Sequence, residues 1–127
     1  MLEINNFTNS KIDGKSFSQV AKKVLKGENR VRDSLSLAFV SKVEIKKLNK
    51  KFRKKNKPTD VLSFELRDRN YLGEVVICPE VVEEEGEDVL RVFVHGILHL
   101  CGYDHENSAK EFEKMEKNQE KYLDKLK

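Results

Sequence analysis

The sequence has few of the residues that mark secreted, disulfide-bonded or membrane proteins. It contains two cysteines, two prolines and no tryptophan in 127 residues. Cys78 and Cys101 form no CxxC pair and lie among apolar residues, which indicates buried thiols and no disulfide framework. No apolar run is long enough to cross a bilayer, and residues 1–14 lack the features of a signal peptide. We therefore expect a cytoplasmic protein with no membrane partner.

No internal repeat or Pro/Ser-rich linker interrupts the chain, so we expect one domain, residues 1–127. Hydrophobic periodicity predicts the elements. The predicted strands span 2–5, 34–40, 61–66 and 72–78, and the predicted helices span 16–27, 41–57, 89–101 and 108–126. Strand 72–78 is apolar on both faces around Val75, which predicts a central strand covered on both sides. Helix 108–126 is expected to pack on the core through residues at a 3-4 spacing, which are Phe112, Met115, Gln119, Tyr122 and Leu126. Three of these helices open on capping pairs, which are Ser16/Gln19, Ser41/Glu44 and Ser108/Glu111. This alternation predicts an α+β fold of α/β-like order, a small mixed β-sheet of about four strands packed with helices.

Charge is distributed unevenly along the chain. The net charge is +3, but residues 1–60 hold 16 Lys/Arg against 6 Asp/Glu, whereas residues 61–127 hold 9 against 16. Residues 46–57 contain eight basic residues in twelve. Such a segment attracts phosphates regardless of base sequence, so it favours RNA or another phosphate polymer as partner. A solvated helix face in a charge-rich protein is the alternative.

Histidine is also scarce, and its placement is unusual. The chain has three histidines, His95, His99 and His105, all within eleven residues. On a helix His95 and His99 share one face, and Gly102 can end the helix and turn the chain so that His105 returns toward that face. Three imidazoles that leave a fourth position open are typical of a catalytic zinc site. The sequence therefore predicts a metal site, with zinc favoured over nickel, copper or iron.

The same spacing matches H-E-x-x-H-x-x-G-x-x-H of metzincin proteases, except at one position. Gly96 stands where those proteases carry the glutamate that acts as general base. This difference argues against peptide hydrolysis. We also hypothesise that the missing side chain lets a bulky substrate approach the metal closely.

Three blocks of the sequence resemble the YbeY endoribonucleases of bacteria. They are N-x-x-F-R-x-x-x-x-P-T-D-V-L-S-F (49–64), L-G-E-V-V-I-C (72–78) and V-H-G-I-L-H-L-C-G-Y-D-H (94–105). The resemblance implies a zincin-like fold and a zinc ion bound by His95, His99 and His105. It also implies single-strand-specific RNA cleavage in maturation of the small-subunit ribosomal RNA 3′ end and in ribosome quality control. The implied partners are the small ribosomal subunit and assembly factors such as the GTPase Era.

The resemblance also assigns roles and shows two departures. The family's motif arginine matches Arg53, which is implicated in activity near the metal. Glu65 stands where the family usually has proline, and the stretch between Val82 and Val94 is shorter than the family's, so that it lacks most of a helix beside the cleft. That shortening bears on substrate range.

We hypothesise metal-assisted RNA cleavage in which Arg53 stabilises charge on the scissile phosphate. The lysines that would draw in the RNA backbone are Lys50, Lys51, Lys54 and Lys57. Asp104 is expected to orient a metal-bound histidine, and a role as general base is its alternative. Two other functions stay open: a metallohydrolase of peptides or small molecules, and a non-catalytic ribosome-assembly factor with a structural zinc.

Overall fold

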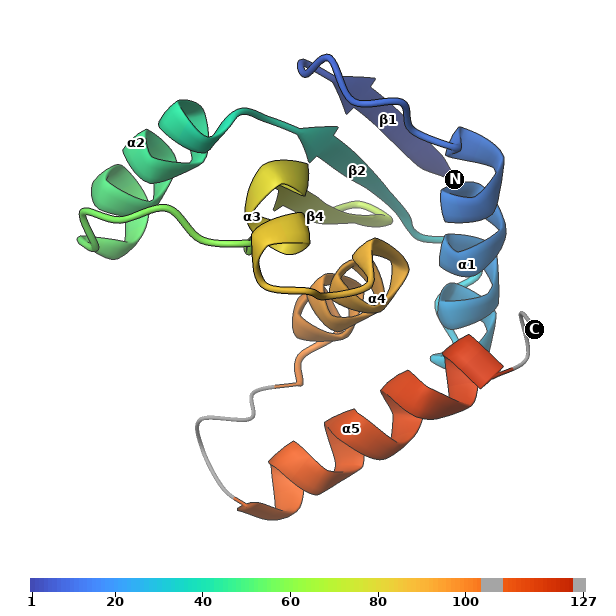
Figure 1. Cartoon of the computed structure of the whole chain (residues 1–127). Helices are drawn as coiled ribbons and strands as arrows, with labels where there is room; N and C mark the ends of the chain where they lie inside the picture. Colours follow the sequence, from blue (N-terminus) through green and yellow to red (C-terminus); the bar gives the residue numbers. More distant parts are fainter. Residues whose placement is uncertain (104–108, 125–127) are drawn as a thin grey trace.

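The computed structural model describes residues 1–103 and 109–124, which form a four-stranded sheet with helices packed around it (Figure 1). The elements in chain order are β1 (Leu2–Asn6), α1 (Gly14–Gly27), β2 (Ser34–Phe39), α2 (Lys42–Arg53), β3 (Val61–Asp68), β4 (Tyr71–Ile77), α3 (Pro79–Glu84), α4 (Val89–Leu100) and α5 (Ala109–Asp124). In these ranges no helix is long and apolar enough to span a membrane.

The sheet has the strand order β1-β2-β4-β3. β1 pairs with β2 and β2 with β4 in parallel, while β3 pairs with β4 in antiparallel orientation. The parallel pairs need crossovers, and α1 supplies the one between β1 and β2. This arrangement confirms the predicted α+β fold with a mixed four-stranded sheet. It also confirms that the strand around Val75 is central, because β4 lies between two neighbours.

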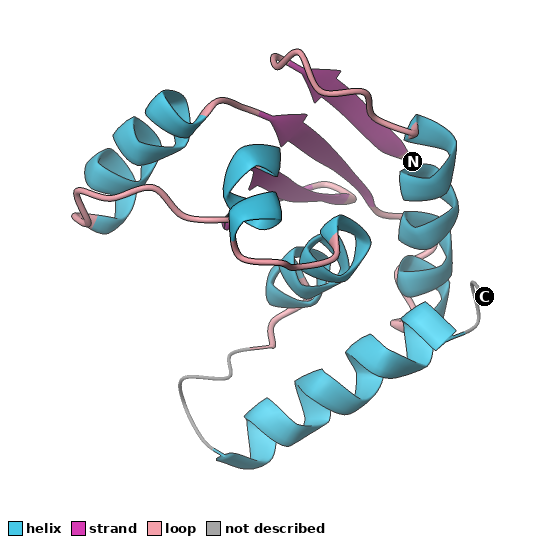
Figure 2. Ribbon diagram, in the orientation of Figure 1, coloured by secondary structure: helices cyan, strands magenta, loops and turns pink. Residues whose placement is uncertain are grey.

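Helices cover both faces of the sheet (Figure 2). The larger core joins one face of β2 and β4 to α1, α4 and α5, and the rings of Phe17 on α1, Phe39 on β2 and Phe93 on α4 meet edge to face within it. The smaller core joins the other face to α2 and α3 through Ile45 and Val81. Every strand except β1 is packed on both faces. The sheet is therefore a rigid support for the helices that cover it.

The start of α1 and the end of α2 differ most from the prediction, and α3 was not predicted. α1 is capped by Asp13, whose carboxylate accepts a hydrogen bond from the backbone N–H of Ser16, so Ser16 lies inside the helix instead of capping it. Ser41 caps α2 as predicted, but α2 ends at Arg53 and not near Pro58. Lys54 stops the helix by adopting a left-handed conformation, with φ of 59°. The predicted cap Ser108 lies outside the described residues.

α5 lies across α4 and α1 on the outer side of the larger core (Figure 1). Of its predicted apolar stripe, Met115, Gln119 and Tyr122 are buried. Phe112 is 46% exposed, so its prediction as a core residue was wrong. Leu126 lies outside the described residues. The buried part of the stripe therefore begins at Met115.

Candidate functional site

α4 presents two histidines on one face, as the spacing predicts. Asp88 caps the start of the helix by accepting from the backbone N–H of Leu90, and Gly102, with φ of 102°, follows its last turn. The Nε2 atoms of His95 and His99 lie 3.1 Å apart, and the two rings meet at 77°. The regular geometry of α4 thus brings two imidazole nitrogens to a single point.

A third side chain, Gln119 of α5, holds one of these rings. Its Oε1 lies 3.1 Å from Nδ1 of His95, and the side chain is only 3% exposed. The sequence predicts Gln119 as a packing residue of this helix and gives it no role in the site. The available signal was chemical: it is the one amide in a stripe that otherwise reads Phe, Met, Tyr and Leu. A buried amide needs a hydrogen-bond partner, and here that partner is His95.

The spacing of the histidine pair suits a shared metal ion. Two nitrogens bound to one tetrahedral zinc at about 2.0–2.1 Å would lie about 3.3–3.4 Å apart, close to the 3.1 Å between the two Nε2 atoms. Within residues 1–103 and 109–124, no group of three or more His, Cys, Asp or Glu side chains is placed to hold a metal. The expected third ligand, His105, and the expected orienting residue, Asp104, lie outside the described residues.

Gly96 does not face the place where a substrate would approach the histidines. A Cβ atom on Gly96 would lie 2.7 Å from Cγ1 of Val75 and 3.3 Å from Oγ of Ser63, both on the sheet. The hypothesis that this glycine opens the metal to a bulky substrate is therefore wrong. Its lack of a side chain allows α4 to pack closely against β3 and β4.

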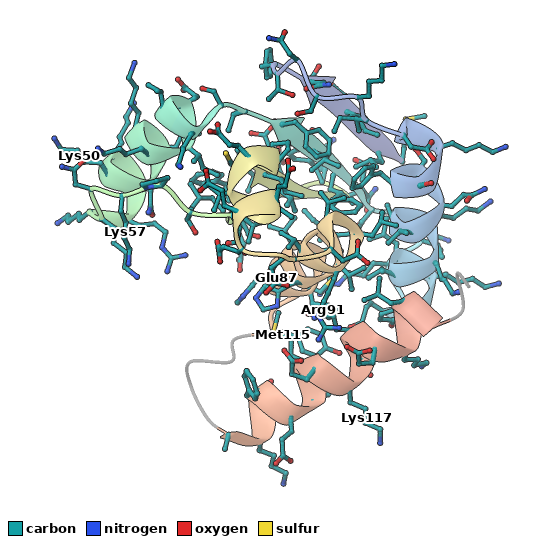
Figure 3. The ribbon with its side chains drawn as sticks, in the orientation of Figure 1. Lys50, Lys57, Glu87, Arg91, Met115 and Lys117 are labelled. Carbon is teal, nitrogen blue, oxygen red and sulfur yellow. The ribbon has the colours of Figure 1, made fainter. Side chains whose placement is uncertain are left out.

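A cleft of about 270 Å³ opens beside His95. Its polar lining comes from Asp60, Glu87, Arg91, His95, Glu116 and Gln119. Arg91 projects between α4 and α5 (Figure 3) and forms ion pairs with Glu116 and Glu120. Carboxylates thus outnumber the cleft's single guanidinium, so cations that attract a polyanion must come from another element.

The basic segment forms an exposed surface at the end of α2. All five residues singled out in the sequence are exposed: Lys50, Lys51, Arg53, Lys54 and Lys57. Lys54 and Lys57 lie in the loop that follows α2, which corrects their placement on a helix. Asn49, only 2% exposed, fixes that loop because its Nδ2 donates a 2.8 Å hydrogen bond to the carbonyl oxygen of Lys57.

The structure does not bring these lysines to the histidines. Figure 3 shows Lys50 and Lys57 projecting outward at one side of the molecule, well apart from Arg91 and Glu87 at the cleft. The chain nevertheless connects the two places directly. It runs from Lys57 to Asp60, which lines the cleft and whose carbonyl accepts from the N–H of Cys78. The loop that carries Lys54 and Lys57 therefore leads along the chain to the cleft beside His95.

Comparison with known proteins agrees with this arrangement. The family model described as endoribonuclease YbeY matches residues 3–127. Endoribonuclease YbeY of Thermotoga maritima is 41% identical over 100 residues, covering 72% of this chain and 67% of that protein. The protein of the same name from Thermosipho melanesiensis is 36% identical over 130 residues, covering 93% of this chain and 94% of that one.

A solved structure shares the fold. The solution structure of a Thermotoga maritima protein superposes with a TM-score of 0.68 at 33% sequence identity, covering 99% of this chain and 91% of that chain. The family match spans nearly the whole chain, and it includes both described histidines, the cleft beside His95 and the basic surface. The chain therefore belongs to the endoribonuclease YbeY family.

Proposed function

We propose that this chain is a metal-dependent endoribonuclease that cuts single-stranded RNA in the maturation of ribosomal RNA, at the 3′ end of the small-subunit RNA. Membership of a family named for RNA cleavage supports the reaction class. The observation that carries the metal dependence is the pair of imidazole nitrogens 3.1 Å apart on α4, beside a cleft.

His95 and His99, joined by His105, would hold the metal, and zinc is the ion that such a donor set favours. A bound zinc would supply a Lewis acid and lower the pKa of a water molecule to about 7. The chain's own side chains would orient the histidine ligands. His95 is kept in orientation by Gln119, and Asp104 is assigned to hold another of the three rings, with a role as general base as the alternative.

Arg53 and the lysines would bind the RNA. Arg53 can grip one phosphate through two parallel hydrogen bonds and stabilise charge that develops on it. Lys50, Lys51, Lys54 and Lys57 would attract the flanking backbone through charge alone. The described geometry supports separate places for RNA binding and metal binding, because the basic surface lies at the end of α2 whereas the cleft beside His95 is acidic. We assign the small ribosomal subunit and the assembly GTPase Era as partners on the family resemblance alone.

The proposal is tested with labelled single-stranded RNA that carries an unprocessed small-subunit 3′ end. Metal-stripped protein, zinc-restored protein and the His99→Ala variant are compared with Lys117→Ala, a matched control because Lys117 is exposed on the outer side of α5 (Figure 3). We expect cleavage only by zinc-loaded wild type and the control. RNA that is bound but uncut in every sample would favour the assembly-factor function, and zinc-dependent cleavage of casein without RNA cleavage would favour a peptide hydrolase.

A further inference from the structure

We propose that Gln119 is a positioning residue that fixes the tautomer of His95 and so presents its Nε2 as a metal ligand. This inference rests on the proposed function in one respect, that His95 binds a metal. It adds a residue from α5, an element that carries none of the three histidines.

The contact between Gln119 and His95 fixes the direction of one hydrogen bond. The side-chain oxygen of Gln119 lies 3.1 Å from Nδ1 of His95. An amide oxygen only accepts hydrogen bonds, so Nδ1 must donate and must carry the proton. A neutral imidazole has one such proton, which leaves a lone pair on Nε2. Nε2 is the atom that lies 3.1 Å from Nε2 of His99, where the metal is proposed to sit.

Burial increases the free-energy preference for the Nδ1–H tautomer of His95. Gln119 is 3% exposed, so water cannot readily replace the imidazole as its partner. A buried amide or ring N–H without a partner costs about 1–3 kcal/mol. With the amide oxygen facing His95, the opposite tautomer would place a lone pair of Nδ1 against the lone pairs of that oxygen and would lose the hydrogen bond.

α5 is held at several points around Gln119, so the amide does not depend on its own bond for its position. One turn before it, Glu116 pairs with Arg91 of α4 at 3.2 Å. One turn after it, the hydroxyl of Tyr122 donates to the carboxylate of Glu28, the residue that follows α1. These contacts lie at different positions along α5 and join it to α4 and to the end of α1. They fix the backbone of Gln119 and therefore the point at which its side chain meets His95.

The test compares Gln119→Met with wild type. Methionine has a similar length and no oxygen that can accept the Nδ1 proton strongly, so the variant removes the hydrogen bond while filling the space. Gln119→Glu is the conservative variant, because a carboxylate also accepts from Nδ1–H. Lys117→Met is the matched control, since it places methionine on the exposed side of the same helix. Backbone amide NMR spectra establish that each variant is folded.

Two measurements are made, and the first needs no metal. In metal-free protein at a pH where imidazole is neutral, the ¹⁵N shifts and long-range couplings of His95 report its tautomer. We expect Nδ1–H in wild type, Gln119→Glu and Lys117→Met, and a shift toward Nε2–H in Gln119→Met. Zinc affinity is then measured by competition with a chromophoric chelator. We expect Gln119→Met to bind zinc about 10–100-fold more weakly, and Gln119→Glu to match or exceed wild type.

The outcomes separate this inference from the proposed function. Folded Gln119→Met with an unchanged His95 tautomer, or with the zinc affinity of wild type, overturns the inference and leaves RNA cleavage by wild type untouched. Wild-type protein that binds zinc but leaves RNA uncut removes the proposed function, and the comparison of zinc affinities still decides the role of Gln119. Wild-type protein that binds no zinc overturns both.

Discussion

The hydroxyl of Ser63 on β3 donates a 3.1 Å hydrogen bond to the carbonyl oxygen of Gly96 on α4. Ser63 pairs with Val75 across β3 and β4. A Cβ on Gly96 would lie 2.7 Å from Cγ1 of Val75 and 3.3 Å from Oγ of Ser63. The glycine next to His95 is thus a point of close contact between α4 and the sheet. A glutamate at position 96 would point into the sheet.

Replacing Gly96 by alanine should therefore destabilise the protein. The new methyl group would lie 2.7 Å from Cγ1 of Val75, which forces α4 or the strand to move. Overpacking of this kind costs about 1–3 kcal/mol. Urea unfolding of Gly96→Ala should show the loss as a lower midpoint with an unchanged slope.

Gly14→Ala is the control for that experiment. Gly14 is the first residue of α1, and its Cβ would meet only Cδ1 of Ile4, at an ordinary distance of 3.6 Å. Alanine there should leave the free energy of unfolding unchanged or raise it by up to about 1 kcal/mol. Equal effects of the two substitutions would contradict the close packing at Gly96.

Arg53 and the lysines should differ in their effects on RNA. Arg53→Ala should lower the cleavage rate more than RNA affinity, because its guanidinium is assigned to charge that develops during the reaction. Arg53→Lys should restore only part of the rate, since an ammonium lacks the bidentate geometry. Cleavage assays at saturating RNA distinguish the two effects, and full activity of Arg53→Ala would remove Arg53 from the mechanism.

Lys50→Ala and Lys57→Ala should weaken RNA binding without changing the rate at saturation. Each lysine that neutralises a phosphate should contribute about 0.7 to the slope of log affinity against log salt on single-stranded RNA. Fluorescence anisotropy at several salt concentrations measures that slope. Lys117→Ala, on the outer side of α5, should leave it unchanged. An unchanged slope in both the Lys50 and the Lys57 variant would mean that this surface does not bind RNA.

Alkaline pH should destabilise the protein in a way that depends on Tyr103. Burial, together with a hydrogen bond to Glu28, raises the pKa of Tyr103 to about 12, and the same causes raise the pKa of Tyr122. An unfolded tyrosine has a pKa of about 10. Between these values the unfolded chain has lost the proton that the folded protein keeps, so the free energy of unfolding falls as pH rises from about 10 to 12.

Urea unfolding of wild type and Tyr103→Phe at stepped alkaline pH measures this effect. The variant has one fewer group with a raised pKa, so its free energy of unfolding should fall less steeply over that interval. Parallel declines in the two proteins would show that Tyr103 titrates alike in the folded and unfolded states.

Both thiols should be unreactive in the folded protein near neutral pH. Burial raises the pKa of Cys101 to about 11 and raises that of Cys78. The thiolate is the reactive form, so very little of either residue can react at pH 8. A disulfide reagent should modify neither cysteine in native protein and both in guanidinium chloride. Rapid modification of Cys101 in native protein would contradict its raised pKa.

Local patterns of residues determined most of the secondary structure and the pairing of His95 with His99 in the described site. The alternation of β2, the doubly apolar β4 and the i, i+4 spacing of His95 and His99 depend on neighbours within one element, and all three were predicted correctly. The boundaries that failed involve competition between adjacent residues. Asp13 displaced Ser16 as the cap of α1, and Lys54 ended α2 inside its basic run.

Tertiary structure decided what each side chain faces. Nothing in the spacing of Gly96 reveals that Val75 and Ser63 lie within reach of it, because those residues come from strands far along the chain. Gln119 likewise gains its role from the place where α5 crosses α4, 24 residues from His95. The physical reason is the same for both residues. Secondary structure follows from short-range sterics and hydrophobic periodicity, whereas long-range contacts depend on how whole elements pack.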